Sequence, residues 1–200
     1  MNLNRPLIKA LPTNVSSAAF TAKTTLASGD TPLGNNPTQA AQDAVGLKRL
    51  AAEGGAGGYI PSNIRIYPYG LGSDNDVFSL RLWGWWHIGE GPDLAKLWMP
   101  SIIGDFVCTL STFVGLAGSA ILNTERFADT ISIVALDGEY TLTSDVTRFG
   151  TVQLLSPANQ SPACVQVPLR GPEWIEWDFD QSTGTATANA LYQLFDESSK

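Results

Sequence analysis

The residues best suited to chemistry in this chain are the carboxylates of one short acidic segment, residues 173–180. In a β-strand, successive side chains alternate between two faces, so the acids of this segment would follow one another about 6.6–7 Å apart on one face. That face would carry Trp174, Glu176, Asp178 and Asp180, with Ile175, Trp177 and Phe179 turned to the core. Paired carboxylates near this separation hydrolyse glycosides, and the tryptophan could stack on a sugar. Like-charged neighbours on one strand face are, however, more often solvated or paired with arginines of a neighbour.

Other catalytic or metal-binding sets are hard to assemble from this sequence. His87 is the sole histidine, so a Ser-His-Asp or Cys-His mechanism would have to use it, and no nucleophile motif lies near it. Zinc needs three or four His or Cys ligands with local spacing, which one histidine and two distant cysteines do not supply. Asp74-Asn75-Asp76 could hold calcium through oxygen atoms, but these are also ordinary turn residues. We therefore expect no catalytic, cofactor-binding or metal-binding residues.

The densest aromatic segment, residues 78–87, has three tryptophans among four consecutive residues. As a strand, it would turn one set of side chains to the core, namely Phe78, Leu80, Leu82 and Trp86. The opposite face combines two indoles with an arginine and the only histidine, a composition typical of a protein-binding surface. Together with the acidic segment, this face supplies the candidate interface residues, which are Arg81, Trp83, Trp85, His87, Trp174, Glu176 and Asp178.

Length, composition and charge bound the class of protein. Two hundred residues, 44% of them hydrophobic, suffice for one domain with a sizeable core. The longest apolar run, residues 102–122, is interrupted by glycines and an aspartate and is no candidate for a membrane helix of roughly 20 apolar residues. The net charge is −7; residues 1–50 contribute +3 (five basic and two acidic side chains), which leaves −10 for the rest. An acidic body argues against nucleic-acid binding, which requires clustered lysine and arginine.

The two cysteines, Cys108 and Cys164, lie far apart in the sequence. We expect them to be buried free thiols of a chain made in a reducing cytosol, with a disulfide between them as the alternative.

Glycines and prolines divide the chain into an arm and a body. Four glycines within residues 54–58 indicate a flexible hinge, and residues 37–53 before it have the only sustained helical composition of the leader. We therefore expect residues 1–58 to form a flexible or extended N-terminal arm and residues 59–200 to form one domain. In that domain, short strands with prolines near their ends predict an all-β fold, an antiparallel β-sandwich of jelly-roll-like form. Residues 186–195 can form one short C-terminal helix.

Several segments in a fixed order resemble structural proteins of tailed-bacteriophage virions. Residues 66–85 read Ile-Tyr-Pro-Tyr-Gly-Leu-Gly-Ser-Asp-Asn-Asp-Val-Phe-Ser-Leu-Arg-Leu-Trp-Gly-Trp. They are similar to the pattern I-x-P-Y-G-x-G-x-x-x-x-x-F-S-x-R-x-x-G-W of such proteins, and residues 97–100, 127–131 and 183–192 continue the resemblance. It covers most of residues 60–195 and none of the arm. The resemblance implies a head decoration (cement) protein of β-sandwich type, seated on the outside of a capsid lattice.

Three functions follow from these observations. The first is a non-enzymatic virion protein without cofactor, made in the bacterial host cytoplasm, that decorates and stabilises the capsid exterior. Its partners would be the major capsid protein and further copies of itself in a dimer or trimer, because exposed tryptophans invite aggregation unless a partner covers them. It would bind neither nucleic acid nor membrane. The alternative is a carbohydrate-binding module that uses Trp83, Trp85 and Trp174 as stacking platforms, and the third is a glycoside hydrolase built on residues 173–180.

Overall fold

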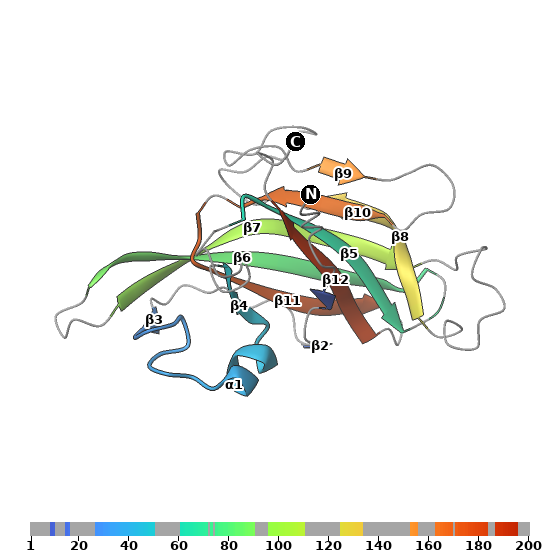
Figure 1. The fold of residues 1–200 in the computed structure, drawn as a ribbon. Helices are drawn as coiled ribbons and strands as arrows, with labels where there is room; N and C mark the ends of the chain where they lie inside the picture. The colour runs from blue at the N-terminus through green and yellow to red at the C-terminus, as the bar shows by residue number, and fades with distance from the viewer. Residues whose placement is uncertain are drawn as a thin grey trace, which may run out of the picture.

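The computed structural model describes residues 9–10, 15–16, 27–50, 61–71, 73, 75–90, 96–110, 125–133, 153–155, 163–169, 171–183 and 187–195. In these ranges the chain forms two β-sheets and one short helix (Figure 1), which confirms the all-β, sandwich-like class. The strands are β1 (Lys9–Ala10), β2 (Val15–Ser16), β3 (Ala27–Ser28), β4 (Leu47–Arg49), β5 (Asn63–Leu71), β6 (Val77–Glu90), β7 (Lys96–Leu110), β8 (Glu125–Ile133), β9 (Gln153–Leu155), β10 (Cys164–Pro168), β11 (Trp174–Thr183) and β12 (Thr187–Phe195). The helix is α1 (Gln39–Ala44).

Sheet A is organised around β5. On one side β12 pairs antiparallel with β5 along its whole length. On the other side β10 pairs with the first half of β5 and β8 with its last residues. The short strands β1 and β9 extend the sheet from β12 and β10.

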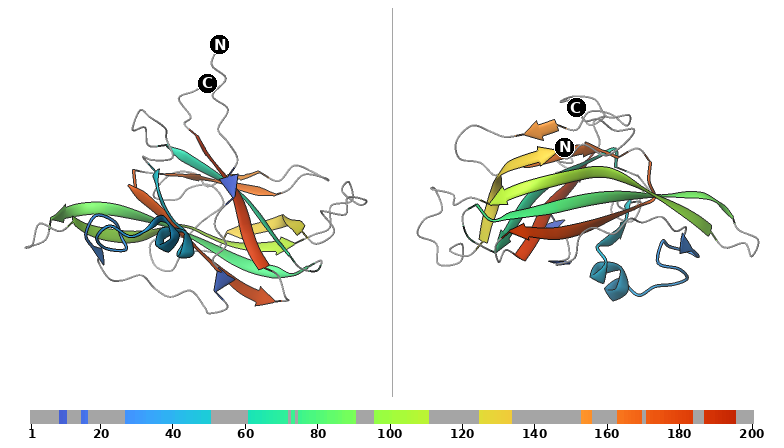
Figure 2. Two further views of the ribbon diagram at one scale, coloured as in Figure 1. Left: turned by 60° about the horizontal axis from the view of Figure 1, so that its bottom comes forward. Right: turned by 180° about the vertical axis from the view of Figure 1, so that it is seen from behind.

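Sheet B is organised around the long hairpin of β6 and β7. The strand β11 pairs antiparallel with β6 from Val77 to Trp85, and β8 pairs with the end of β7. The same β8 serves both sheets, because its first residues pair with β5 and its later residues with β7. It therefore closes one side of the sandwich, as the two views of Figure 2 show.

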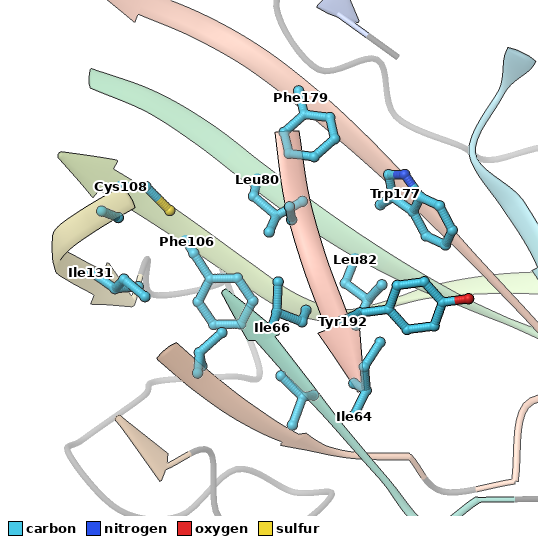
Figure 3. Packing of buried hydrophobic residues seen from close by; sticks show 14 of the residues in the cluster. Ile64, Ile66, Leu80, Leu82, Phe106, Cys108, Ile131, Trp177, Phe179 and Tyr192 are labelled. Carbon is cyan, nitrogen blue, oxygen red and sulfur yellow. The ribbon is translucent and has the colours of Figure 1, made fainter. Parts of the chain in front are cut away.

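The main core lies between the two sheets (Figure 3). The register of β6 and β11 sets Leu80 opposite Phe179 and Leu82 opposite Trp177, so alternation turns these side chains to the same face. They meet Ile64, Ile66 and Tyr192 from sheet A, and all of them are almost fully buried. The predicted core positions Phe78, Leu80, Leu82, Ile175, Trp177 and Phe179 are thereby confirmed.

Trp86, the remaining predicted core residue of β6, is only half-buried. Its ring lies over Gly84, where an added Cβ would come within 2.5 Å of it. The prediction is wrong because Trp86 lies on the hairpin extension, where β11 has ended opposite Trp85 and β6 pairs with β7. Beyond that point, β6 has left the part of the sandwich in which the two sheets face each other.

The N-terminal segment 27–50 is part of the folded unit, in contrast to the expected free arm. The strand β3 pairs with β7, and β4 pairs with β11. Leu47 and Leu50 are fully buried, and Leu50 belongs to the main core. The expected hinge at residues 54–58 lies outside the described residues.

The helix of this segment is much shorter than the helical composition of residues 37–53 predicts. It ends at Ala44, and Gly46 then adopts a φ of +69° as the chain turns into β4. A Cβ on Gly46 would lie 2.8 Å from the carbonyl oxygen of Trp177, so only glycine fits this turn against β11.

The C-terminal helix expected at residues 186–195 is not formed, since this segment is β12. Ala188, Ala190 and Tyr192 are buried in alternation with half-exposed neighbours. That period of two fits a strand, and the continuous pairing with β5 overrides the helical preference of alanine and leucine.

The turn at residues 73–76, the two cysteines and the question of a membrane helix can also be compared with the structure. Ser73 and Asp76 form a turn in which the Ser73 amide donates to the Asp76 carboxylate (2.8 Å) and Asn75 has a φ of +68°. Cys108 and Cys164 are buried free thiols, as expected. Among the described residues, no helix is long and apolar enough to cross a membrane.

Candidate functional site

The register of sheet B brings the predicted interface residues onto one face. On β6 and β11, Trp85 lies opposite Trp174, Trp83 opposite Glu176 and Arg81 opposite Asp178. Alternation along both strands turns these side chains away from the main core. These six of the candidate residues therefore share one face of sheet B.

The tryptophans of this face are buried, which corrects the expectation that they form an exposed interface. Trp83, Trp85 and Trp174 are each only 4–5% exposed. Trp85 and Trp174 pack with Leu47 of β4 and Trp98 of β7 in a second apolar cluster, which we call the aromatic cluster. The cover comes from the N-terminal segment, since β4 supplies Leu47 and the carbonyl of Gly29 accepts from the Trp98 indole (3.0 Å).

Two acids of the acidic segment, residues 173–180, bind indole groups. Trp85 Nε1 donates to Glu176 Oε2 at 2.8 Å, and Trp83 Nε1 donates to Asp178 Oδ2 at 3.0 Å. These bonds satisfy the indole donors that burial would otherwise leave unpaired. Glu176 is itself buried. A sugar therefore has no access to Glu176 or to the buried indoles.

Arg81 forms an ion pair with Asp105, which is not among the residues predicted from the sequence. Its Nε and Nη2 both donate to Oδ2 of Asp105, at 3.0 and 2.6 Å, from the directly opposite position on β7. The guanidinium also lies 6.0 Å from the centre of the Trp83 ring. Burial raises the pKa of the Asp105 carboxyl, and the bonds from Arg81 offset part of that effect. Only the pairing register of β6 with β7 identifies Asp105, and a single sequence does not supply that register.

His87 is exposed and packs against the indole of Trp98, with 5.5 Å between ring centres. Trp98 in turn meets Trp174 edge to face at 6.5 Å. His87 therefore lies at the rim of the aromatic cluster. In the part of the chain that the structure describes, no group of three His, Cys, Asp or Glu side chains could hold a metal ion.

The β6–β7 hairpin extends well beyond the two sheets, as Figures 1 and 2 show from several sides. The large hydrophobic side chains that are exposed in the described ranges are Leu33, Ile88 and Met99. Ile88 and Met99 lie on this extension, at 49% and 46% exposure, and half-buried Trp86 lies directly across from Met99. We call Trp86, Ile88 and Met99 the hairpin patch. Ile88 is the extra residue of a β-bulge between His87 and Gly89, and bulges of this kind re-aim side chains at sheet ends.

The apolar surface accessible to a partner is therefore displaced from the predicted face to the end of the hairpin. Strand alternation predicts Trp86 in the core, and Met99 belongs to a segment, residues 97–100, for which the sequence indicates only the family resemblance. A comparison of the chain with protein-family models, curated proteins and solved structures finds no match.

Proposed function

We propose that this chain is a non-enzymatic structural protein of a tailed-phage virion, which decorates and stabilises the capsid from outside. The observation that carries the proposal is the hairpin patch, an apolar surface held away from the body of the domain. The resemblance of residues 60–195 to virion structural proteins supplies the class of particle. On this proposal the chain is made in the bacterial host cytoplasm and assembles onto the virion exterior.

The composition of the hairpin patch favours a protein partner. Tryptophan and methionine are enriched in protein interfaces, and a few apolar anchors carry most of the binding free energy. Complete burial of one such side chain is worth about 1.5–3 kcal/mol. Because Ile88 and Met99 are already about half-buried, each would contribute roughly 1 kcal/mol when a partner covers it.

The arrangement of the hairpin suits a lattice-binding role. It projects from the sandwich, so a partner can enclose its end without disturbing the core. We propose the major capsid protein as that partner, with further copies of this chain, as a dimer or trimer, as neighbours on the lattice. Repetition at symmetric positions multiplies a modest contact through avidity.

The carbohydrate-binding and glycoside hydrolase alternatives lose their main support. Both depended on Trp174 and its neighbours being open to a sugar, whereas the three tryptophans concerned are buried and two are hydrogen-bonded to the candidate acids.

Co-sedimentation with capsids that lack the chain tests this proposal. Met99→Lys should weaken binding about tenfold or more, because a charge replaces an apolar anchor and one factor of ten is about 1.4 kcal/mol. The matched control is Thr130→Lys, which adds the same charge at an exposed position of β8, away from the hairpin end. Equal binding of the two variants, or no binding of the unaltered chain, would overturn the proposal.

A further inference from the structure

The segment of residues 27–50, which we call the strap, contacts the sandwich in the manner of a bound peptide. At one end the Gly29 amide donates to the Lys96 carbonyl (3.0 Å), and the Trp98 indole donates to the Gly29 carbonyl (3.0 Å). At the other end β4 pairs with β11, and the Leu50 amide donates to the Glu173 carbonyl (2.9 Å). The strap thus crosses the outer face of sheet B from β7 to β11.

The site that receives the strap is formed by the sandwich itself. Three of the four members of the aromatic cluster, Trp85, Trp98 and Trp174, come from β6, β7 and β11, and the strap adds Leu47, with half-buried Val45 packed against the cluster. Two contacts within the sandwich hold these rings, namely the hydrogen bond of Trp85 to Glu176 and the edge-to-face contact of Trp98 with Trp174, while the strap adds the bond from the Trp98 indole to the Gly29 carbonyl. A preorganised apolar site of this kind accepts its ligand with little loss of side-chain entropy.

The strap has internal contacts of its own. Thr38 caps α1 by accepting from the Ala41 amide, and Lys48 pairs with Asp43 at 2.6 Å. The helix α1 has no buried residue. The contacts that hold the strap on the sandwich are therefore made mostly by β3, Gly29, Leu47 and Leu50.

The connection from the strap to β5 is longer than its own sandwich requires. Leu50 is bonded to Glu173, and Ser62 is bonded to Leu169, only four residues away along the chain. The path from Leu50 to Ser62 through the sandwich consists of two strand pairings of about 5.5 Å and four residues of about 3.6 Å. Leu50 and Ser62 therefore lie about 25 Å apart at most. The chain from residue 50 to residue 62 can span about 40 Å, and four of its residues are glycine.

We propose that the strap is exchanged between copies of this chain, so that residues 27–50 of one copy occupy the aromatic cluster of a second copy. Exchange replaces every contact by an identical one, and it is therefore a low-cost route to self-association. The connection of residues 51–61 keeps the strap near its own site at an effective concentration in the millimolar range. Free, dilute copies keep the strap on their own sandwich, and copies that are crowded together exchange it.

A mixed cross-link measures the exchange with purified chains, so its outcome does not depend on capsid binding. Ser28 and Leu97 are directly opposite in the pairing of β3 with β7. The bond from Gly29 to Lys96 makes them a non-hydrogen-bonded pair, with Cα atoms about 4.5 Å apart, close enough for a disulfide. One chain carries Ser28→Cys with a tag, and the other carries Leu97→Cys without one. A single chain that carries both substitutions is the positive control, because it should form the disulfide internally when dilute if the oxidation works.

After mixing and mild oxidation, a disulfide between residues 28 and 97 can join the two kinds of chain only if straps have exchanged. Half of the exchanges in an equal mixture join chains of the same kind, so we expect the mixed product, identified by its linked peptide, in roughly one chain in two hundred at 10 µM and in about a quarter of the chains near 1 mM. Mixed product that stays at the dilute level after incubation at 1 mM, while the double variant still links internally, overturns the proposal.

Discussion

Replacement of Leu50 by alanine tests whether the strap is part of the folded core. Leu50 is fully buried in the main cluster, although its segment has the composition of a free arm. Leucine-to-alanine changes at fully buried positions cost about 2–5 kcal/mol, because apolar contacts are lost and a cavity remains. With a cost of about 3 kcal/mol, and about 2–4 °C per kcal/mol for a chain of this size, the melting temperature should fall by about 6–12 °C.

The assays are thermal unfolding and urea unfolding at micromolar concentration, each followed by circular dichroism and by tryptophan fluorescence. Leu33→Ala is the matched control, since it makes the same change in the same segment at a side chain that is 41% exposed. The control should change the free energy of unfolding by no more than about 0.5 kcal/mol. If Leu50→Ala is as mild as the control, the strap does not belong to the core and the expectation of a free arm is restored.

Three further predictions concern other parts of the sandwich. Trp85→Ala should destabilise the fold by about 3–5 kcal/mol and Trp86→Ala by roughly half as much in urea titrations, because only Trp85 is fully enclosed; equal losses would contradict the placement of Trp86. Burial raises the pKa of Asp105 above its ordinary value of 3.8. The contribution of this carboxyl to folding stability is therefore present below that pH and is lost as the pH rises through the raised pKa. The stability of the unaltered chain relative to Asp105→Asn should therefore decrease over that window, and an increase would contradict it. Burial also raises the pKa of the Cys108 and Cys164 thiols, so neither should react with an aromatic disulfide reagent at pH 8 until the chain is unfolded; rapid labelling of the native chain would contradict this.

The strand content and the two alternating faces could be predicted from the sequence. Phe78, Leu80 and Leu82 alternate with polar or amphipathic residues, and so do the apolar residues of 173–180. Period-two patterns of this kind specify which side chains point together, whatever the partner strand is.

What covers each face could not be predicted, because that depends on contacts distant in sequence. The strap has few large apolar residues, so its composition resembles that of an unattached arm. Its position depends on a few residues, including Leu47, Leu50 and the turn at Gly46, where the fit against Trp177 decides the path. The sequence therefore predicts Trp83 and Trp85 as the surface available to a partner, whereas in the structure that surface is the end of the hairpin.

Alternation also failed where the sandwich ends. The pattern places Trp86 with Leu82, but Trp86 lies beyond the start of β11, on the hairpin extension, and is only half-buried. At residues 186–195 the frequent alanines suggested a helix. Small side chains are equally suited to the inner face of β12, where Ala188 and Ala190 are fully buried.

The proposed role on a phage capsid can be examined by electron cryo-microscopy of virus particles that contain this chain. The account predicts density for the two-sheet fold at symmetric positions on the capsid exterior, with Trp86, Ile88 and Met99 enclosed by the capsid protein. Particles without such density, or with the hairpin patch facing solvent, would contradict it.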